Sequence, residues 1–137
     1  YNDLSIFPRF EFGYGLSYTS FQYTNLQLSK KKINSHEQIA VTCAITNTGN
    51  YAGEETVQLY IRDKVGSIVR PVKELKDFKK IKLAAGETKT VSFLINREKL
   101  SFYNEQLQWV AEPGDFELMI GASSRDIRLK SAFELVK

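Results

Sequence analysis

The sequence predicts an all-β domain built as a sandwich of two antiparallel sheets. Three observations lead to this prediction: apolar and polar residues alternate at a period of two in several segments, a convincing helical stripe is missing, and turn residues separate the alternating segments. Because a strand directs successive side chains to opposite faces, each alternating segment is expected to bury one face. With one further strand at 72–83, about seven short strands are predicted, the number expected for a sandwich.

The alternating segments follow one another along the chain. The first changes face between Tyr23 and Leu26, as a β-bulge would cause. The clearest runs from Ile39 to Ile45 and is followed by turn residues at 47–50. Phe93 lies in the middle of a later segment and is therefore predicted to be a central core residue. The remaining segments are centred on 57–61, 91–95, 116–120 and 129–136.

Residues 72–83 follow a different pattern, because apolar residues recur there at every third position. Pro71 could open a short helix with that spacing, but no capping pattern follows and lysines crowd the end of the segment. A bulged edge strand explains the same spacing, and lysines on an edge strand discourage aggregation. We therefore predict a strand. The apolar residues concerned are Val72, Leu75, Phe78 and Ile81.

The composition is that of an ordinary globular domain. The chain has 137 residues, of which 42% are hydrophobic and 26% charged, so neither disorder nor a membrane span is favoured. A net charge of +3 is too small to indicate nucleic-acid binding. The single Cys43 excludes an internal disulfide and, with the single His36, makes a metal site improbable. We expect Cys43 to be buried and inert, His36 to lie in an exposed loop, and the domain to hold no cofactor.

The first 18 residues are predicted to form a docking arm or linker from a preceding domain, with the sandwich covering 19–137. Gly13 and Gly15 relax the backbone beside bulky rings, which suits a tight path through an apolar cleft. The rings could equally fold back onto the sandwich and extend its core. The chain begins at Tyr1 without a leader, so we expect a fragment of a longer protein. The proposed docking residues are Phe7, Phe10, Phe12, Tyr14 and Tyr18.

Several motifs resemble the fibronectin type III-like C-terminal domain of family 3 glycoside hydrolases, the β-glucosidase and β-xylosidase group. The resemblance runs in order over nearly the whole chain, with loop departures at Glu11, Asp77 and Ala85. The matching strings are FGYGLSYT at 12–19, NTG at 47–49, AGEE at 52–55, VQLYI at 57–61, RPVKEL at 70–75, FKK at 78–80, AGETKTV at 85–91, GDF at 114–116 and GASSRDI at 121–127.

This resemblance implies a fibronectin type III-like, immunoglobulin-like sandwich that serves as a non-catalytic accessory domain. The partner implied is the preceding catalytic part of the same parent chain, which in this family carries the catalytic carboxylates, and the parent would be a periplasmic or secreted bacterial enzyme. The domain would stabilise the catalytic assembly, and its loops would border the active-site mouth. The second cysteine and central tryptophan of a true immunoglobulin domain are missing.

The residues themselves predict no catalytic site. Retaining glycosidases need two carboxyl groups about 5–5.5 Å apart, whereas the adjacent Glu54 and Glu55 should point to opposite faces of a strand. The alternatives are an adhesion-type sandwich and a carbohydrate-binding module, in which an exposed Tyr51, Tyr60 or Tyr103 would stack on sugar rings. Trp109 is expected to cap the core. We expect neither nucleic-acid nor membrane binding.

Overall fold

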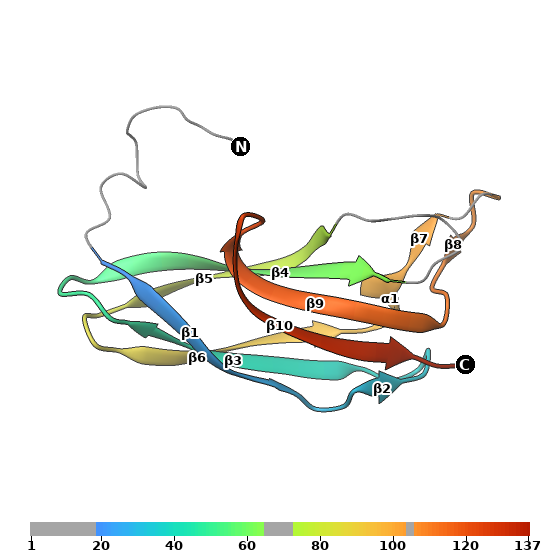
Figure 1. Ribbon diagram of the computed structural model, residues 1–137, viewed down its shortest axis with the longest axis horizontal. Helices are drawn as coiled ribbons and strands as arrows, with labels where there is room; N and C mark the ends of the chain where they lie inside the picture. The colour runs from blue at the N-terminus through green and yellow to red at the C-terminus, as the bar shows by residue number, and fades with distance from the viewer. Residues whose placement is uncertain (1–18, 65–72, 104–105) are drawn as a thin grey trace.

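The computed structural model describes residues 19–64, 73–103 and 106–137, so the predicted arm lies outside the described residues. A three-stranded sheet has the order β1-β3-β6 and a five-stranded sheet the order β2-β10-β9-β4-β5 (Figure 1). The first comprises β1 (Phe21–Leu28), β3 (Ile39–Asn47) and β6 (Thr88–Ile95). The second comprises β2 (Lys32–Ile33), β10 (Asp126–Leu135), β9 (Gly114–Ser123), β4 (Gly53–Asp63) and β5 (Glu74–Leu83).

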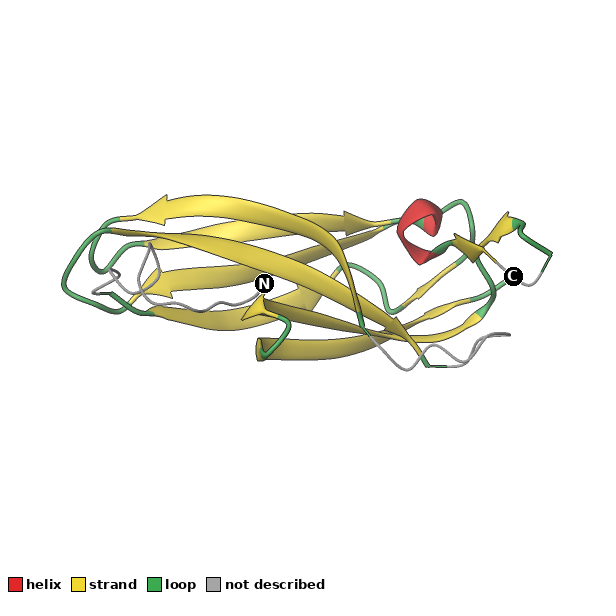
Figure 2. Ribbon diagram, turned by 90° about the horizontal axis from the view of Figure 1, so that it is seen from above, coloured by secondary structure: helices red, strands yellow, loops and turns green. Residues whose placement is uncertain are grey.

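The two sheets pack face to face, and their inward side chains form one hydrophobic core (Figures 1 and 2). Every second residue of β3 from Ile39 to Ile45 is buried, which confirms the predicted alternation. Phe93 in β6 belongs to the same core, as predicted. In the opposite sheet, Phe116 stacks on Phe133 with ring centroids 5.4 Å apart. The all-β sandwich is therefore confirmed.

The described strands match the expected number and pairing with small additions. Seven strands have eight residues or more, and the pairings among these seven are antiparallel. The two-residue β2 pairs with β10 in parallel. A short hairpin of β7 (Phe102–Tyr103) and β8 (Trp109–Val110) follows a single helical turn, α1 (Arg97–Leu100). Asn96 caps this turn by accepting a hydrogen bond from the Lys99 amide.

Both predicted bulges are present. In β1 the register against β3 shifts between Thr24 and Gln27, and Asn25 adopts a positive φ of 59°. Asparagine tolerates this left-handed conformation better than most residues. The second bulge lies in β5, because the consecutive Leu59 and Tyr60 of β4 pair with Asp77 and Leu75 and leave Lys76 as the extra residue. As predicted, β5 is an edge strand.

Candidate functional site

The described tyrosines proposed to contact sugar do not form one platform. Tyr51 lies in the connection between β3 and β4, and Tyr103 lies in β7. The β3–β4 connection follows the end of β3, and β7 follows the end of β6. Because β3 and β6 are antiparallel, these two positions lie at opposite ends of the sandwich (Figure 1). Both side chains are exposed. A sugar stacked on one of them could not reach the other.

Two aromatic residues are placed differently from the predictions. Tyr60 is only 7% exposed, and its hydroxyl donates a hydrogen bond to Oε1 of Gln58. The prediction of an exposed Tyr60 is therefore wrong, and its ring offers no free face to a sugar. Trp109 was expected to cap the core but is 47% exposed. It packs against Tyr103 with ring centroids 4.9 Å apart and planes tilted by 58°, so the pair does not form a flat stacking surface.

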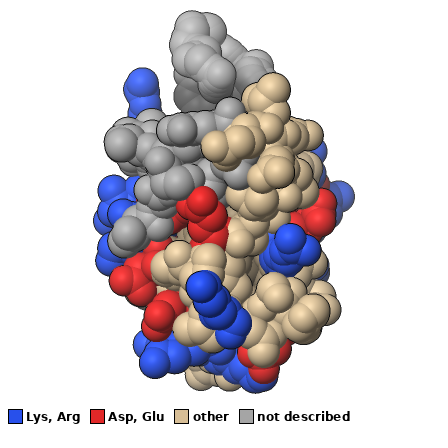
Figure 3. All heavy atoms as spheres, turned by 90° about the vertical axis from the view of Figure 1, so that its right-hand side faces the viewer, with Lys and Arg blue, Asp and Glu red and all other residues tan. Residues whose placement is uncertain are grey.

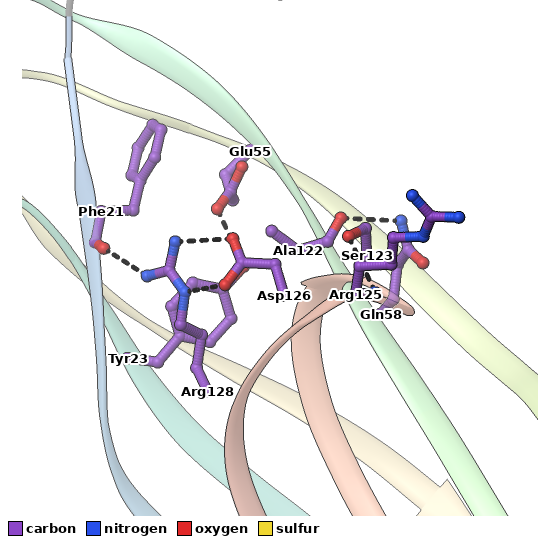
Figure 4. Close-up of polar contacts among 9 residues, drawn as sticks. All are labelled: Phe21, Tyr23, Glu55, Gln58, Ala122, Ser123, Arg125, Asp126 and Arg128. Carbon is purple, nitrogen blue, oxygen red and sulfur yellow. Dashed lines mark hydrogen bonds and ion pairs between the residues drawn. The ribbon is translucent and has the colours of Figure 1, made fainter. Parts of the chain in front are cut away.

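A polar cluster, which we call the clasp, joins the two sheets at one end of the core (Figure 4). The Tyr23 hydroxyl of β1 donates to Oε2 of Glu55 in β4 over 2.8 Å. Arg128 of β10 holds both carboxylate oxygens of Asp126, at 2.6 and 2.9 Å, and its Nη1 donates to the carbonyl of Phe21 at 2.9 Å. Its guanidinium also lies 5.1 Å from the centre of the Tyr23 ring.

The two carboxylates of the clasp have opposite pKa shifts. Burial raises the pKa of Glu55, although the hydrogen bond from Tyr23 and the nearby Arg128 oppose that shift. The hydrogen bonds from Arg128 lower the pKa of Asp126. Burial, together with the adjacent Glu55 carboxylate, raises the pKa of Tyr23 well above its ordinary value. Such a divergence between neighbouring carboxyl groups is also what a glycosidase uses to separate its acid from its nucleophile.

The contacts of the clasp nevertheless favour a structural role. Both oxygens of Asp126 are engaged by Arg128, so neither is free to attack a sugar. Glu55 is partly buried behind Tyr23 and points between the sheets. A nearby open cleft of about 410 Å³ is lined by Glu54 and Glu87 but not by Glu55 or Asp126. The expectation that Glu54 and Glu55 face opposite ways is thus confirmed, and the clasp ties β1 to β4 and β10.

The raised pKa of Glu55 leads to a pH-dependent prediction for Glu55→Gln. Because the folded-state pKa lies above the ordinary 4.5, the stability contributed by protonated Glu55 is fully present below pH 4.5. It is lost as the pH rises through the raised value. The variant, which keeps an acceptor for Tyr23, should therefore be more stable than the parent sequence at pH 7, with that advantage disappearing near pH 4. Paired thermal melts at the two pH values measure this difference.

Glu54→Gln is the matched control, because it removes the same charge from the exposed neighbouring side chain. We expect its effect on the melting temperature to be similar at both pH values. A Glu55→Gln variant that is destabilised most at neutral pH would show that the ionised carboxylate holds the clasp together, contrary to this prediction.

Asn47 organises the loops at the end of the sandwich where the described chain begins. Its fully buried side chain donates to the carbonyls of Tyr51 at 2.8 Å and Leu83 at 3.1 Å. Its Oδ1 accepts from the Gly49 amide at 2.9 Å and from the Thr19 hydroxyl. Thr19 also packs so closely on Gly49 and Gly53 that a Cβ at either glycine would overlap it. One side chain thus fixes three segments that are distant in sequence.

The remaining reactive side chains have no arrangement that suggests chemistry. Cys43 is buried on the inward face of β3, and burial raises the pKa of its thiol to about 11, which disfavours the nucleophilic thiolate. His36 lies in the exposed turn before β3, where its amide donates to Asn34 Oδ1 at 2.9 Å. Within the described ranges, no group of three or more His, Cys, Asp or Glu side chains could hold a metal ion.

At the end of the molecule seen in Figure 3, lysines and arginines are interspersed with carboxylates, so this face presents no continuous basic surface. None of the helices in the described part of the chain is long and apolar enough to cross a membrane.

Two features were missed by the sequence analysis. Asn47 was interpreted as a turn residue because Thr48, Gly49 and Asn50 follow it, although it is the last residue of β3. Tyr23, Glu55 and Arg128 are far apart in the sequence, and no motif links them. A polar residue at an inward position of an alternating strand, such as Glu55 two residues before Val57, was the available signal for the clasp.

Comparison with known proteins identifies the domain family. A model of the fibronectin type III-like domain matches residues 55–124. The chain is 46% identical over its whole length to β-glucosidase BoGH3A of Bacteroides ovatus, and 45% identical over 95% of its length to a β-xylosidase of Formosa agariphila. It spans only 18% of the length of each of these relatives.

Solved structures give the same result. The crystal structure of β-glucosidase from Listeria innocua in complex with glucose superimposes with a TM-score of 0.83 and 42% identity, covering 100% of this chain and 19% of that one. The similarity in fold and the similarity in sequence therefore agree. The chain belongs to the fibronectin type III-like domain family, in the form found in the β-glucosidases and β-xylosidases of glycoside hydrolase family 3.

Proposed function

We propose that this domain is a non-catalytic accessory domain of a family 3 glycoside hydrolase, and that it stabilises the catalytic domains of its parent chain. One observation carries the proposal: the whole chain aligns with β-glucosidase BoGH3A, yet it accounts for only 18% of that protein. The carboxylates of the clasp have structural partners, which supports a role without catalysis. Deleting residues 19–137 from the parent should lower its melting temperature and its activity; an unchanged enzyme would overturn the proposal.

The substrate proposed for the parent is a β-glucoside or a β-xyloside, without a choice between the two. One relative is named a β-glucosidase and another a β-xylosidase at almost the same identity, so this domain does not distinguish the two sugars. Carbohydrate contact by the domain itself is less well supported, since Tyr51 and Tyr103 lie at opposite ends and Tyr60 is buried. We further propose that loops of the domain border the mouth of the parent's active site.

The isolated chain should not hydrolyse aryl β-glucosides or β-xylosides. The reason is that the neighbouring carboxylates of the clasp, Glu55 and Asp126, are held by Tyr23 and Arg128. A chromogenic assay on the purified chain measures this, with the full-length parent as the positive control. Turnover that survives repurification and disappears in an Asp126→Asn or Glu55→Gln variant would contradict the prediction.

We also propose that residues 1–18 dock on a preceding domain of the parent chain. If so, replacing Phe12 and Tyr14 by serine should leave the melting temperature of the isolated chain nearly unchanged while lowering the stability or activity of the parent. Thermal melts of both proteins, with and without the substitutions, measure the effect. A large decrease in the isolated chain would instead assign these rings to its own core.

A further inference from the structure

Four apolar side chains form a patch on the outward face of the five-stranded sheet. In β4 the inward residues Val57, Leu59 and Ile61 belong to the core, so the intervening Tyr60 faces outward. Directly opposite residues of an antiparallel pair share a face, which places further apolar residues beside it. Tyr60 pairs with Leu75 of β5 and Met119 of β9, and Gln58 pairs with Phe78. We call Tyr60, Leu75, Phe78 and Met119 the outer patch.

The outer patch is unusual for a solvated sheet face, which normally carries polar residues. Leu75 is 49% exposed and Phe78 54% exposed, while Tyr60 and Met119 are buried but lie outside the core cluster. Polar groups border the patch: Gln58 donates to the Ala122 carbonyl, and Arg62 pairs with Glu117 at 3.2 Å. An apolar area with a polar border on a sheet face is typical of an interaction site.

We infer that the outer patch, through its exposed members Leu75 and Phe78, is a surface by which this domain docks against a preceding domain of its parent chain. The inference rests on the proposed accessory function and adds to it a specific surface. With Lys76 as the extra residue of the bulge, Leu75 and Phe78 both face outward although they are three positions apart, whereas Leu83 of the same strand is in the core.

The length of the relatives supports this choice of partner. The relatives contain more than four-fifths of their length outside the region matched, since the chain spans 18% of them, so a large partner surface is expected in the parent.

Other occupants fit the outer patch less well. A symmetric contact with a second copy through this face would bring together the lysines of β5, since Lys80 and Lys82 share the outward face with Phe78. A sugar would find one exposed ring, Phe78, because the Tyr60 ring is covered and its hydroxyl is already bonded to Gln58. An interdomain contact needs neither a second ring nor a neutral border.

The test is a pair of substitutions, Leu75→Thr with Phe78→Thr, made in both the isolated chain and the full-length parent. Threonine suits a strand, so the isolated chain should keep its melting temperature. The parent should melt at least about 2 °C lower. Amide exchange in residues 74–83 should be slower by about tenfold or more in the unmodified parent than in the isolated chain. Leu94→Thr, on the outward face of β6 and 51% exposed, is the matched control and should change neither protein.

Three results would overturn the inference. The first is a parent whose melting temperature and amide exchange are indifferent to the double substitution. The second is an isolated chain that loses as much stability as the parent, which would assign the patch to the domain's own fold. The third is a change of oligomeric state in size-exclusion light scattering, which would assign it to a second copy. If deleting the whole domain also leaves the parent unchanged, the accessory function itself fails; if only the double substitution is silent, the surface alone fails.

Discussion

Replacing Phe93 by alanine is expected to reduce the free energy of unfolding by about 3–5 kcal/mol. Phe93 is buried in β6, pairs with Val41 of β3, and belongs to the core between the two sheets. Removing the ring forfeits the free energy gained when the ring is transferred from water to the core. It also leaves a cavity, and the two costs add. Because domains of this size are stable by only about 5–15 kcal/mol, the variant should be marginally folded. Chemical denaturation of the isolated chain measures the loss.

Leu94→Ala is the internal control for this prediction. Leu94 is the next residue along β6, and its side chain lies half exposed on the opposite face of the sheet. We expect it to lower the free energy of unfolding by less than about 1 kcal/mol. Similar losses at both positions, or a loss below about 1 kcal/mol at Phe93, would mean that the facing of β6 is reversed.

Local pattern was sufficient to predict the strands and several turns. Alternation over Ile39 to Ile45 fixes which residues of β3 face inward, because the period of a strand is two whatever its partners are. The turn at Ala84 to Glu87 was also predictable: the Glu87 amide donates to the Ala84 carbonyl at 2.9 Å, and Gly86 adopts a φ of 80°. Both features depend on a few neighbouring residues only.

The outward faces were harder to predict, because alternation separates two faces without saying what covers either of them. Tyr60 was correctly placed opposite Val57 and Leu59, yet it is buried. Leu75 and Phe78 were recognised as apolar residues of an edge strand, but their shared outward direction depends on the bulge at Lys76 between them. Trp109 sits in a two-residue strand, which is too short to show any alternation.

The clasp and the Asn47 contacts depend on tertiary structure alone. Tyr23 and Glu55 are 32 residues apart, and they meet because β1 and β4 belong to different sheets that face each other. The sequence predicts strands but not which sheet each one joins, so it could not place these partners together. Polar residues of this kind specify how the two sheets are aligned, whereas the apolar pattern mainly requires that they pack.

Asn47→Ala should be nearly as damaging as Phe93→Ala, with a loss of about 3–5 kcal/mol, although Asn47 is polar and carries no catalytic role. The substitution removes hydrogen bonds to the carbonyls of Tyr51 and Leu83 and from the amide of Gly49. Since Asn47 is fully buried, water cannot easily replace these bonds, and each group left without a partner costs about 1–3 kcal/mol.

The comparison with Thr48→Ala isolates this effect. Thr48 is the adjacent residue, and its exposed hydroxyl bonds to Ser20, so its loss can be compensated by water and should cost less than about 1 kcal/mol. Asn47→Asp sharpens the test, because a carboxylate still accepts from Gly49 but repels the two carbonyls. It should therefore be at least as destabilising as alanine near neutral pH. Denaturation curves of the three variants measure the losses in free energy of unfolding. Equal, small losses at Asn47 and Thr48 would mean that backbone contacts hold this end of the sandwich, such as the bond from the backbone N–H of Asn47 to the Glu87 carbonyl at 2.9 Å. The buried side chain of Asn47 would then contribute little.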